Sequence, residues 1–189
     1  MRLAKPSRVA VVPSMILSTL IPFGKIEKAQ LVRLPDGSHV EVAKRSMEFS
    51  RCVPLFKVWG KPIIDVNGEK MCPETAVAKM FRDRGWEAVW ISRNRYIGAF
   101  PPLTPCELST KAEAELLKVR ANRNFTGCWD VFAFKRGRVL FVECKGNDRF
   151  RPSQYAWLAA ALGAGFTLEN FLILQFRLRS GLNATASAT

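Results

Sequence analysis

The chain has 189 residues, of which 48% are hydrophobic, 24% charged and 11% aromatic, so it can bury a core as one compact domain with appendages. Its 12 glycines and 11 prolines exclude collagen-like and low-complexity chains. The 29 Lys and Arg residues against 16 Asp and Glu residues give a net charge of +13, which indicates a polyanionic partner such as nucleic acid.

The N-terminal stretch joins basic residues to an apolar run from Val9 to Ile21, as in a signal peptide. Pro13 interrupts this run, which is also too short to span a bilayer. We therefore expect a mature segment with no stable membrane association, and peripheral membrane binding is the alternative.

Residues 1–72 are predicted to form an N-terminal accessory region that contains a β-hairpin. Residues 30–34 and 38–42 alternate between apolar and polar side chains, and Pro35-Asp36-Gly37 between them is a good turn signal. The role of this region stays open.

From residue 73 the order of predicted elements is helix, strand, insertion, hairpin, helix, strand. Pro73 begins a helix that ends before Gly85, and residues 86–92 form a strand. Residues 93–126 form an insertion, with a helix that Ser109 caps. The remaining predicted elements are strands over 129–134 and 138–145, a helix over 152–162 and a strand over 171–178.

This order predicts an α/β fold in residues 73–179, with a mixed central β-sheet flanked by helices. Residues 180–189 are predicted to form a flexible C-terminal tail.

The strand over 138–145 combines two apolar faces with charge at its end. A strand of this kind belongs in the middle of a covered sheet, where charged side chains are costly to bury. Glu143 and Lys145 nevertheless share one face at its end. With Arg136 and Gly137 as the two turn residues, Asp130 lies opposite Glu143, with Cβ atoms about 4.5–5.5 Å apart. Facing carboxylates repel unless a divalent cation binds both, so the pattern predicts a metal site. A bulge at Gly137 would instead shift the register by one residue.

Glu74 is a candidate third carboxylate. It shares a helical stripe with Val77, Ala78 and Phe81, which places it on the face toward the sheet. A Glu in the first turn is also favoured by the helix dipole alone, so both interpretations stay open. Glu113 and Glu115 of the inserted helix are expected on a solvated face.

Asp130, followed after twelve residues by Glu143-Cys144-Lys145, resembles the signature of the PD-(D/E)XK nuclease superfamily. The longer string resembles the virus-type replication-repair (VRR-NUC) branch, in which a Gly shortly before the Asp is usual, as Gly127 is here. The residues that carry this resemblance are Val139 to Gly146, Asp148, Arg149, Arg151, Pro152, Ser153, Gln154 and Trp157.

The resemblance implies a restriction-endonuclease-like core (αβββαβ) and a metal-dependent DNA endonuclease that hydrolyses phosphodiester bonds, with branched or structured DNA as a substrate. It implies that Asp130 and Glu143 hold Mg²⁺ or Mn²⁺, with the Cys144 backbone carbonyl as a further ligand. Lys145 would orient or activate the attacking water, and Gln154 would lie near the active centre. Hard oxygen ligands of this kind suit Mg²⁺. The Cys144 thiol alternates to the other face and is expected in the core.

Four arginines are candidates for contact with nucleic acid. Arg149 and Arg151 precede a helix start, where guanidinium groups and free N–H groups suit phosphate contacts, and Arg136 and Arg138 lie at the hairpin turn. Solvated charge is the alternative for these arginines and for Gln154. Trp129 and Trp157 can stack on bases, although aromatic residues beside a sheet more often belong to the core. The candidate catalytic residues are Glu74, Asp130, Glu143, Lys145 and Gln154.

The five cysteines form no CxxC pair, and the chain has one histidine that could act as a further zinc ligand. This pattern argues against a zinc site and favours reduced, buried thiols in a cytosolic protein. We expect a cytoplasmic location in a bacterium, phage-encoded or nucleoid-associated, or a nuclear one in a eukaryote. DNA is the expected partner. The sequence leaves open whether the chain forms a homodimer. The competing function is an inactive nucleic-acid-binding module with a nuclease-like fold, against which the intact Asp130, Glu143 and Lys145 argue.

Overall fold

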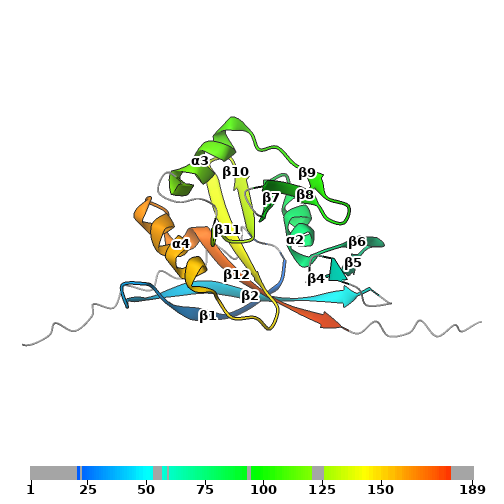
Figure 1. Cartoon of the computed structure of the whole chain (residues 1–189), viewed down its shortest axis with the longest axis horizontal. Coiled ribbons are helices and arrows are strands. Elements are labelled where there is room, and N and C mark those ends of the chain that lie inside the picture. The colour runs from blue at the N-terminus through cyan, green and yellow to red at the C-terminus, as the bar shows by residue number, and fades with distance from the viewer. Residues whose placement is uncertain are drawn as a thin grey trace, which may run out of the picture.

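The structure is a computed structural model, and it describes residues 21, 23–52, 57–58, 60–92, 95–120 and 126–179. The expected tail over 180–189 lies outside the described residues, as does the N-terminal run before Ile21. In the described part, a mixed β-sheet crosses the molecule, and helices pack on both of its faces (Figure 1). No helix in these residues is long and apolar enough to cross a membrane.

The strands of the sheet follow the order β6-β5-β2-β12-β11-β10-β7-β8-β9, and β1 pairs with β2 beside this path. Their bounds are β1 Lys25–Arg33, β2 His39–Arg51, β5 Ile64–Val66, β6 Glu69–Met71, β7 Glu87–Ser92, β8 Arg95–Ala99, β9 Thr104–Pro105, β10 Val131–Lys135, β11 Arg138–Lys145 and β12 Phe171–Arg179. A separate hairpin joins β3 Lys57–Val58 to β4 Lys61–Pro62. The helices are α2 Pro73–Arg82, α3 Thr110–Arg120 and α4 Pro152–Gly163, and a 3₁₀ turn covers Leu168–Asn170. The pairs β11–β12 and β12–β2 are parallel and the others antiparallel, so the predicted mixed sheet flanked by helices is confirmed.

The hairpin of β10 and β11 has the predicted register. Val131 lies opposite Val142, and Lys135 lies opposite Arg138. The two turn residues, Arg136 and Gly137, both have positive φ, at 51° and 79°, as a type I′ hairpin turn requires. The hairpin therefore closes without a bulge.

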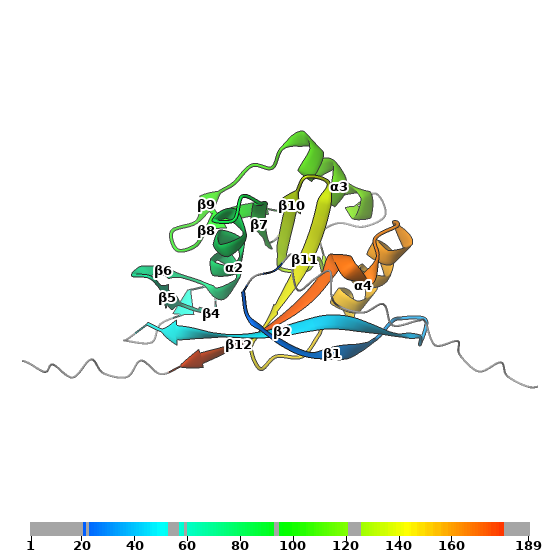
Figure 2. The ribbon, with the colours of Figure 1, turned by 180° about the vertical axis from the view of Figure 1, so that it is seen from behind.

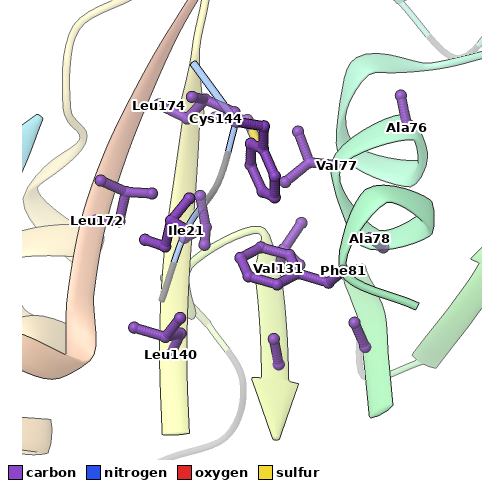
Figure 3. Packing of buried hydrophobic residues seen from close by; sticks show 14 of the residues in the cluster. Ile21, Ala76, Val77, Ala78, Phe81, Val131, Leu140, Cys144, Leu172 and Leu174 are labelled. Atoms are coloured by element: carbon purple, nitrogen blue, oxygen red, sulfur yellow. The ribbon is translucent and has the colours of Figure 1, made fainter. Parts of the chain in front are cut away.

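Strand β11 is buried on both faces because helices cover the sheet on each side. Leu140, Val142 and Cys144 pack in one core with α2, and Figure 3 shows Val77 and Phe81 of that helix facing this side of the sheet. On the other face, the Phe141 ring lies 4.8 Å from that of Trp157 in α4. Each large apolar side chain buried in this way contributes about 1.5–3 kcal/mol, so the strand is held firmly in place.

The N-terminal hairpin is part of the central sheet, which the sequence did not predict. Strand β2 pairs in parallel with β12, from Ala43 opposite Leu172 to Ser50 opposite Arg179. In Figure 2 the two strands run side by side along one edge of the molecule. Strands β5 and β6 extend the sheet beyond β2, so the described part of residues 1–72 continues the sheet of the core.

The predicted insertion is also more regular than expected. Its residues 95–105 form β8 and β9, which extend the sheet beyond β7. Helix α3 follows, and Ser109 caps it as predicted, because the Ser109 Oγ accepts a hydrogen bond from the Ala112 N–H at 3.3 Å.

Candidate active site

Glu143 and Lys145 lie at the C-terminal end of β11 and are almost fully buried, with 1% and 4% of their surface exposed. The Lys145 Nζ lies 2.9 Å from Glu143 Oε1, and the Gln154 side-chain amide donates a hydrogen bond to the same oxygen. Among the described residues, Glu143 Oε2 has no hydrogen-bond partner although it is buried. A buried polar atom without a partner costs about 1–3 kcal/mol and a charged one more, so this oxygen marks a place where a ligand would be stabilised.

Lys145 is held as a cation by several acceptors. Burial alone would lower the pKa of Lys145, but the Glu143 carboxylate and then Asp148 outweigh it and raise that pKa. Besides Glu143, its Nζ contacts Asp148 Oδ2 at 3.2 Å, Gln154 Oε1 at 3.1 Å and the Arg149 carbonyl at 3.5 Å, and it lies 4.8 Å from the centroid of the Phe150 ring. A lysine in this state donates hydrogen bonds to a water or a phosphate and does not remove a proton.

Asp130 directly precedes β10, and extending the observed register by one residue beyond Val131 and Val142 places it opposite Glu143. Its Oδ2 accepts a hydrogen bond from the Cys144 backbone N–H at 3.0 Å. Burial, followed by the negative charges of Glu143 and Glu74, raises the pKa of Asp130 well above its ordinary value. Burial also raises the pKa of Glu143, and Lys145 opposes that change. The two carboxylates therefore occupy one low-dielectric site in which their charge is incompletely balanced.

Glu74 reaches the same centre from α2, on the other side of the sheet. It is 3% exposed, its Oε1 forms an ion pair with Lys61 of β4, and its Oε2 is buried without a partner in the described residues. Burial would lower the pKa of Lys61, but the charges of Glu74 and Asp130 raise it. The helix dipole alone does not account for a Glu that is buried, ion-paired and close enough to Asp130 to shift its pKa.

The donor set suits a hard divalent cation. Asp130 and Glu143 offer carboxylate oxygens, and the unpartnered Glu143 Oε2 is of the type that Mg²⁺ or Mn²⁺ would satisfy. Within the described residues, no group of three or more His, Cys, Asp and Glu side chains is gathered so as to hold a metal ion. A cation here would therefore depend on two side chains together with backbone oxygen, water or substrate, which is common for Mg²⁺.

The start of α4 positions Gln154. Pro152 is the first residue of the helix, and Gln154 Oε1 accepts a hydrogen bond from the Arg151 N–H at 2.9 Å, as the third residue of a capping box does. A Cβ added at Gly127 would lie 2.2 Å from the Ser153 carbonyl oxygen, so the helix start packs directly on a residue that has no side chain. This close approach brings Gln154 to Glu143.

The predicted nucleic-acid contacts fall in two separate places. Arg149 and Arg151 are exposed in the segment between β11 and α4, beside Lys145. Arg136 and Arg138 are exposed at the hairpin turn, at the other end of β11 and roughly 17 Å from Glu143 at about 3.4 Å per residue. They do not contribute to the carboxylate site.

Several other candidates belong to the core or to the surface. Trp129 and Trp157 are 0% and 2% exposed, so their rings pack in the core and are not available to stack on bases. The Cys144 thiol faces α2 (Figure 3), and burial raises its pKa well above the ordinary value, so it stays protonated. Glu113 and Glu115 of α3 contact other side chains, namely Tyr96 and Lys118.

The sequence missed two residues of the site. Lys61 lies in a two-residue strand with no periodic pattern that could have pointed to it. Asp148 belongs to the string of residues that carries the family resemblance, but no role followed from its position; here it contacts Lys145 Nζ and accepts the Gly146 N–H at 3.0 Å.

Comparison with known proteins returned no similar protein: no family model, no curated protein and no solved structure matches the chain.

Proposed function

We propose that this protein is a metal-dependent endonuclease that hydrolyses phosphodiester bonds in DNA. The observation that carries the proposal is Glu143: one carboxylate oxygen is held by Lys145 and Gln154, and the other is buried without a partner in the described residues, opposite Asp130. A purely structural ion pair does not require a second carboxylate at that place, because two buried carboxylates destabilise each other.

Each residue of the site has a separate role in such a reaction. Asp130 and Glu143 would hold Mg²⁺ or Mn²⁺ together with the Cys144 carbonyl, which faces the same side of β11 as the N–H that Cys144 donates to Asp130. A bound ion of this kind polarises the phosphodiester and lowers the pKa of a bound water. Lys145, protonated and two residues from Glu143 on one face, orients the attacking water, and Gln154 holds Glu143 and Lys145 in their relative positions.

The basic surface supplies contacts to the DNA backbone. Arg149 and Arg151 are exposed next to the site and can bind phosphates adjacent to the cleaved bond. Arg136 and Arg138, roughly 17 Å away, would contact phosphates about five base pairs further along, at about 3.4 Å per step. This spacing fits a substrate with a duplex of at least about five base pairs beside the cleaved bond.

The test is a cleavage assay on supercoiled, linear and branched DNA in Mg²⁺, with the wild type beside Glu143→Gln and Lys145→Ala. Both variants should lose cleavage by at least about 100-fold while they keep DNA binding. Glu41→Gln and Lys111→Ala change the same residue types at exposed positions and should cleave as the wild type does. Cleavage that persists in both site variants would refute the proposed centre.

If the wild type binds DNA with a steep salt dependence and cuts none of the three substrates, the protein is the binding module considered above.

A further inference from the structure

Lys61 places a positive charge on the α2 side of the active centre. Its Nζ pairs with Glu74 Oε1 and lies 5.6 Å from the centroid of the Trp90 ring. Trp90 in turn lies opposite Val131, the residue that follows Asp130. The ammonium group of Lys61 therefore lies next to Glu74, and it is close enough to Asp130 for the Asp130 charge to raise the pKa of Lys61.

Each of the two lysines forms an ion pair with a different carboxylate. Lys145 pairs with Glu143 on the α4 side, and Lys61 pairs with Glu74 on the α2 side. The Asp130 carboxylate accepts the Cys144 N–H, and the charges of Glu143, Glu74 and Lys61 all act on the pKa of Asp130. With Asp148, which also contacts Lys145 Nζ, four carboxylates and two ammonium groups leave two net negative charges, which a single divalent cation neutralises.

We propose that Lys61 takes the place of a second divalent cation between Glu74 and Asp130, so that the active centre binds one metal ion per chain. This inference rests on the proposed function. The single ion is held at Asp130 and Glu143, while the ammonium group of Lys61 supplies the fixed positive charge beside Glu74.

The structure gives two reasons for this assignment. A second cation at Glu74 would have to displace the Lys61 ammonium from a carboxylate that is 3% exposed, and it would leave that ammonium without its partner beside another positive charge. The Lys61 side chain also keeps 35% of its surface exposed, so it can contact a DNA phosphate at the site without leaving Glu74.

The test counts bound Mn²⁺ by titration followed by electron paramagnetic resonance, without DNA and without reference to cleavage. Wild type should bind one Mn²⁺ per chain. Lys61→Met frees Glu74 and should bind two, whereas Lys61→Arg keeps the positive charge and should bind one. Lys57→Met is the matched control, because Lys57 is exposed on the paired strand of the same hairpin, and it should bind one.

Glu74→Gln provides a second test that does not depend on the folding of Lys61→Met. At saturating Mn²⁺ this variant should keep one ion per chain, because Glu74 does not hold the single ion, although the ion should bind more weakly than in the wild type because Lys61 has lost its partner. Two ions in the wild type, one ion in a folded Lys61→Met variant, or loss of the ion in Glu74→Gln would each overturn the inference. Those results would leave the proposed function intact if Glu143→Gln still abolishes cleavage, whereas a wild type that binds no Mn²⁺ would refute both.

Discussion

Replacement of Gly127 by Ala should displace the catalytic side chains although it changes none of them. Gly127 has φ of +80°, and a Cβ there would lie 2.2 Å from the Ser153 carbonyl oxygen and 2.4 Å from the carbonyl carbon. Real Cβ contacts stay above about 3.0 Å, so the start of α4 has to move by close to 1 Å. Gln154 is the next residue of that helix and moves with it.

Two costs follow from this geometry. An L-residue in the left-handed region is destabilised by about 1–2 kcal/mol, and the backbone shift adds to this. A melting temperature falls by about 2–4 °C per kcal/mol in a chain of this size, so a decrease of at least about 2 °C is expected. A displacement near 1 Å at a catalytic centre can lower the rate about 100-fold, so kcat should fall much more than DNA affinity.

The assay is single-turnover cleavage in Mg²⁺, with DNA binding and thermal unfolding measured on the same preparations. Gly163→Ala is the matched control: among the described residues, no atom outside the helix's own backbone lies within 4 Å of a Cβ at Gly163, so cleavage and melting temperature should be preserved or slightly improved. A Gly127→Ala protein with wild-type kcat and melting temperature would refute the argument that the approach of α4 to Gly127 positions Gln154.

Three further outcomes follow from the described contacts. Gln154→Leu removes the hydrogen bonds to Glu143 and Lys145, so kcat should fall about 10–100-fold with DNA affinity unchanged, as single-turnover and binding measurements would show. Burial and the neighbouring carboxylates raise the pKa of Asp130, so the metal-free folded state loses stability as the pH rises above the unfolded pKa. The Asp130→Asn variant should therefore have a higher melting temperature than the wild type at pH 8 and the same one at pH 4, and it should not cleave DNA. An unchanged melting temperature at pH 8 would contradict this. Phe141→Ala should lower the free energy of unfolding by about 3–5 kcal/mol in a denaturant titration, because its ring packs on Trp157.

The β10–β11 hairpin was predictable because its determinants are local. A two-residue turn sets the register, and the apolar residues on both faces of 138–145 indicate a central strand, which together place Asp130 opposite Glu143. Arg136 is not a favoured residue at φ of 51°, yet the register holds because both strands are anchored by apolar packing on each face.

The pairing of β2 with β12 was not predictable from local patterns. The partners Ala43 and Leu172 are far apart in the chain, and the alternation of residues 38–42 fits a surface hairpin as well as an inner strand. The role of Glu74 was not predictable either. A Glu in the first turn of a helix is expected from the helix dipole alone, so the sequence does not distinguish it from a buried partner of Lys61.

The position of the active centre follows from unequal strand lengths. β10 begins at Val131, opposite Val142, whereas β11 continues to Lys145 and keeps its parallel pairing with β12. The last three residues of β11 therefore lack an antiparallel partner, and the Asp130 carboxylate accepts the N–H of Cys144 in place of a strand carbonyl. At this gap in the middle of a covered sheet the buried Oε2 atoms of Glu74 and Glu143 have no partner in the described residues, and apolar layers keep the local dielectric low. Electrostatic interactions with a cation or a phosphate are strongest in such a place.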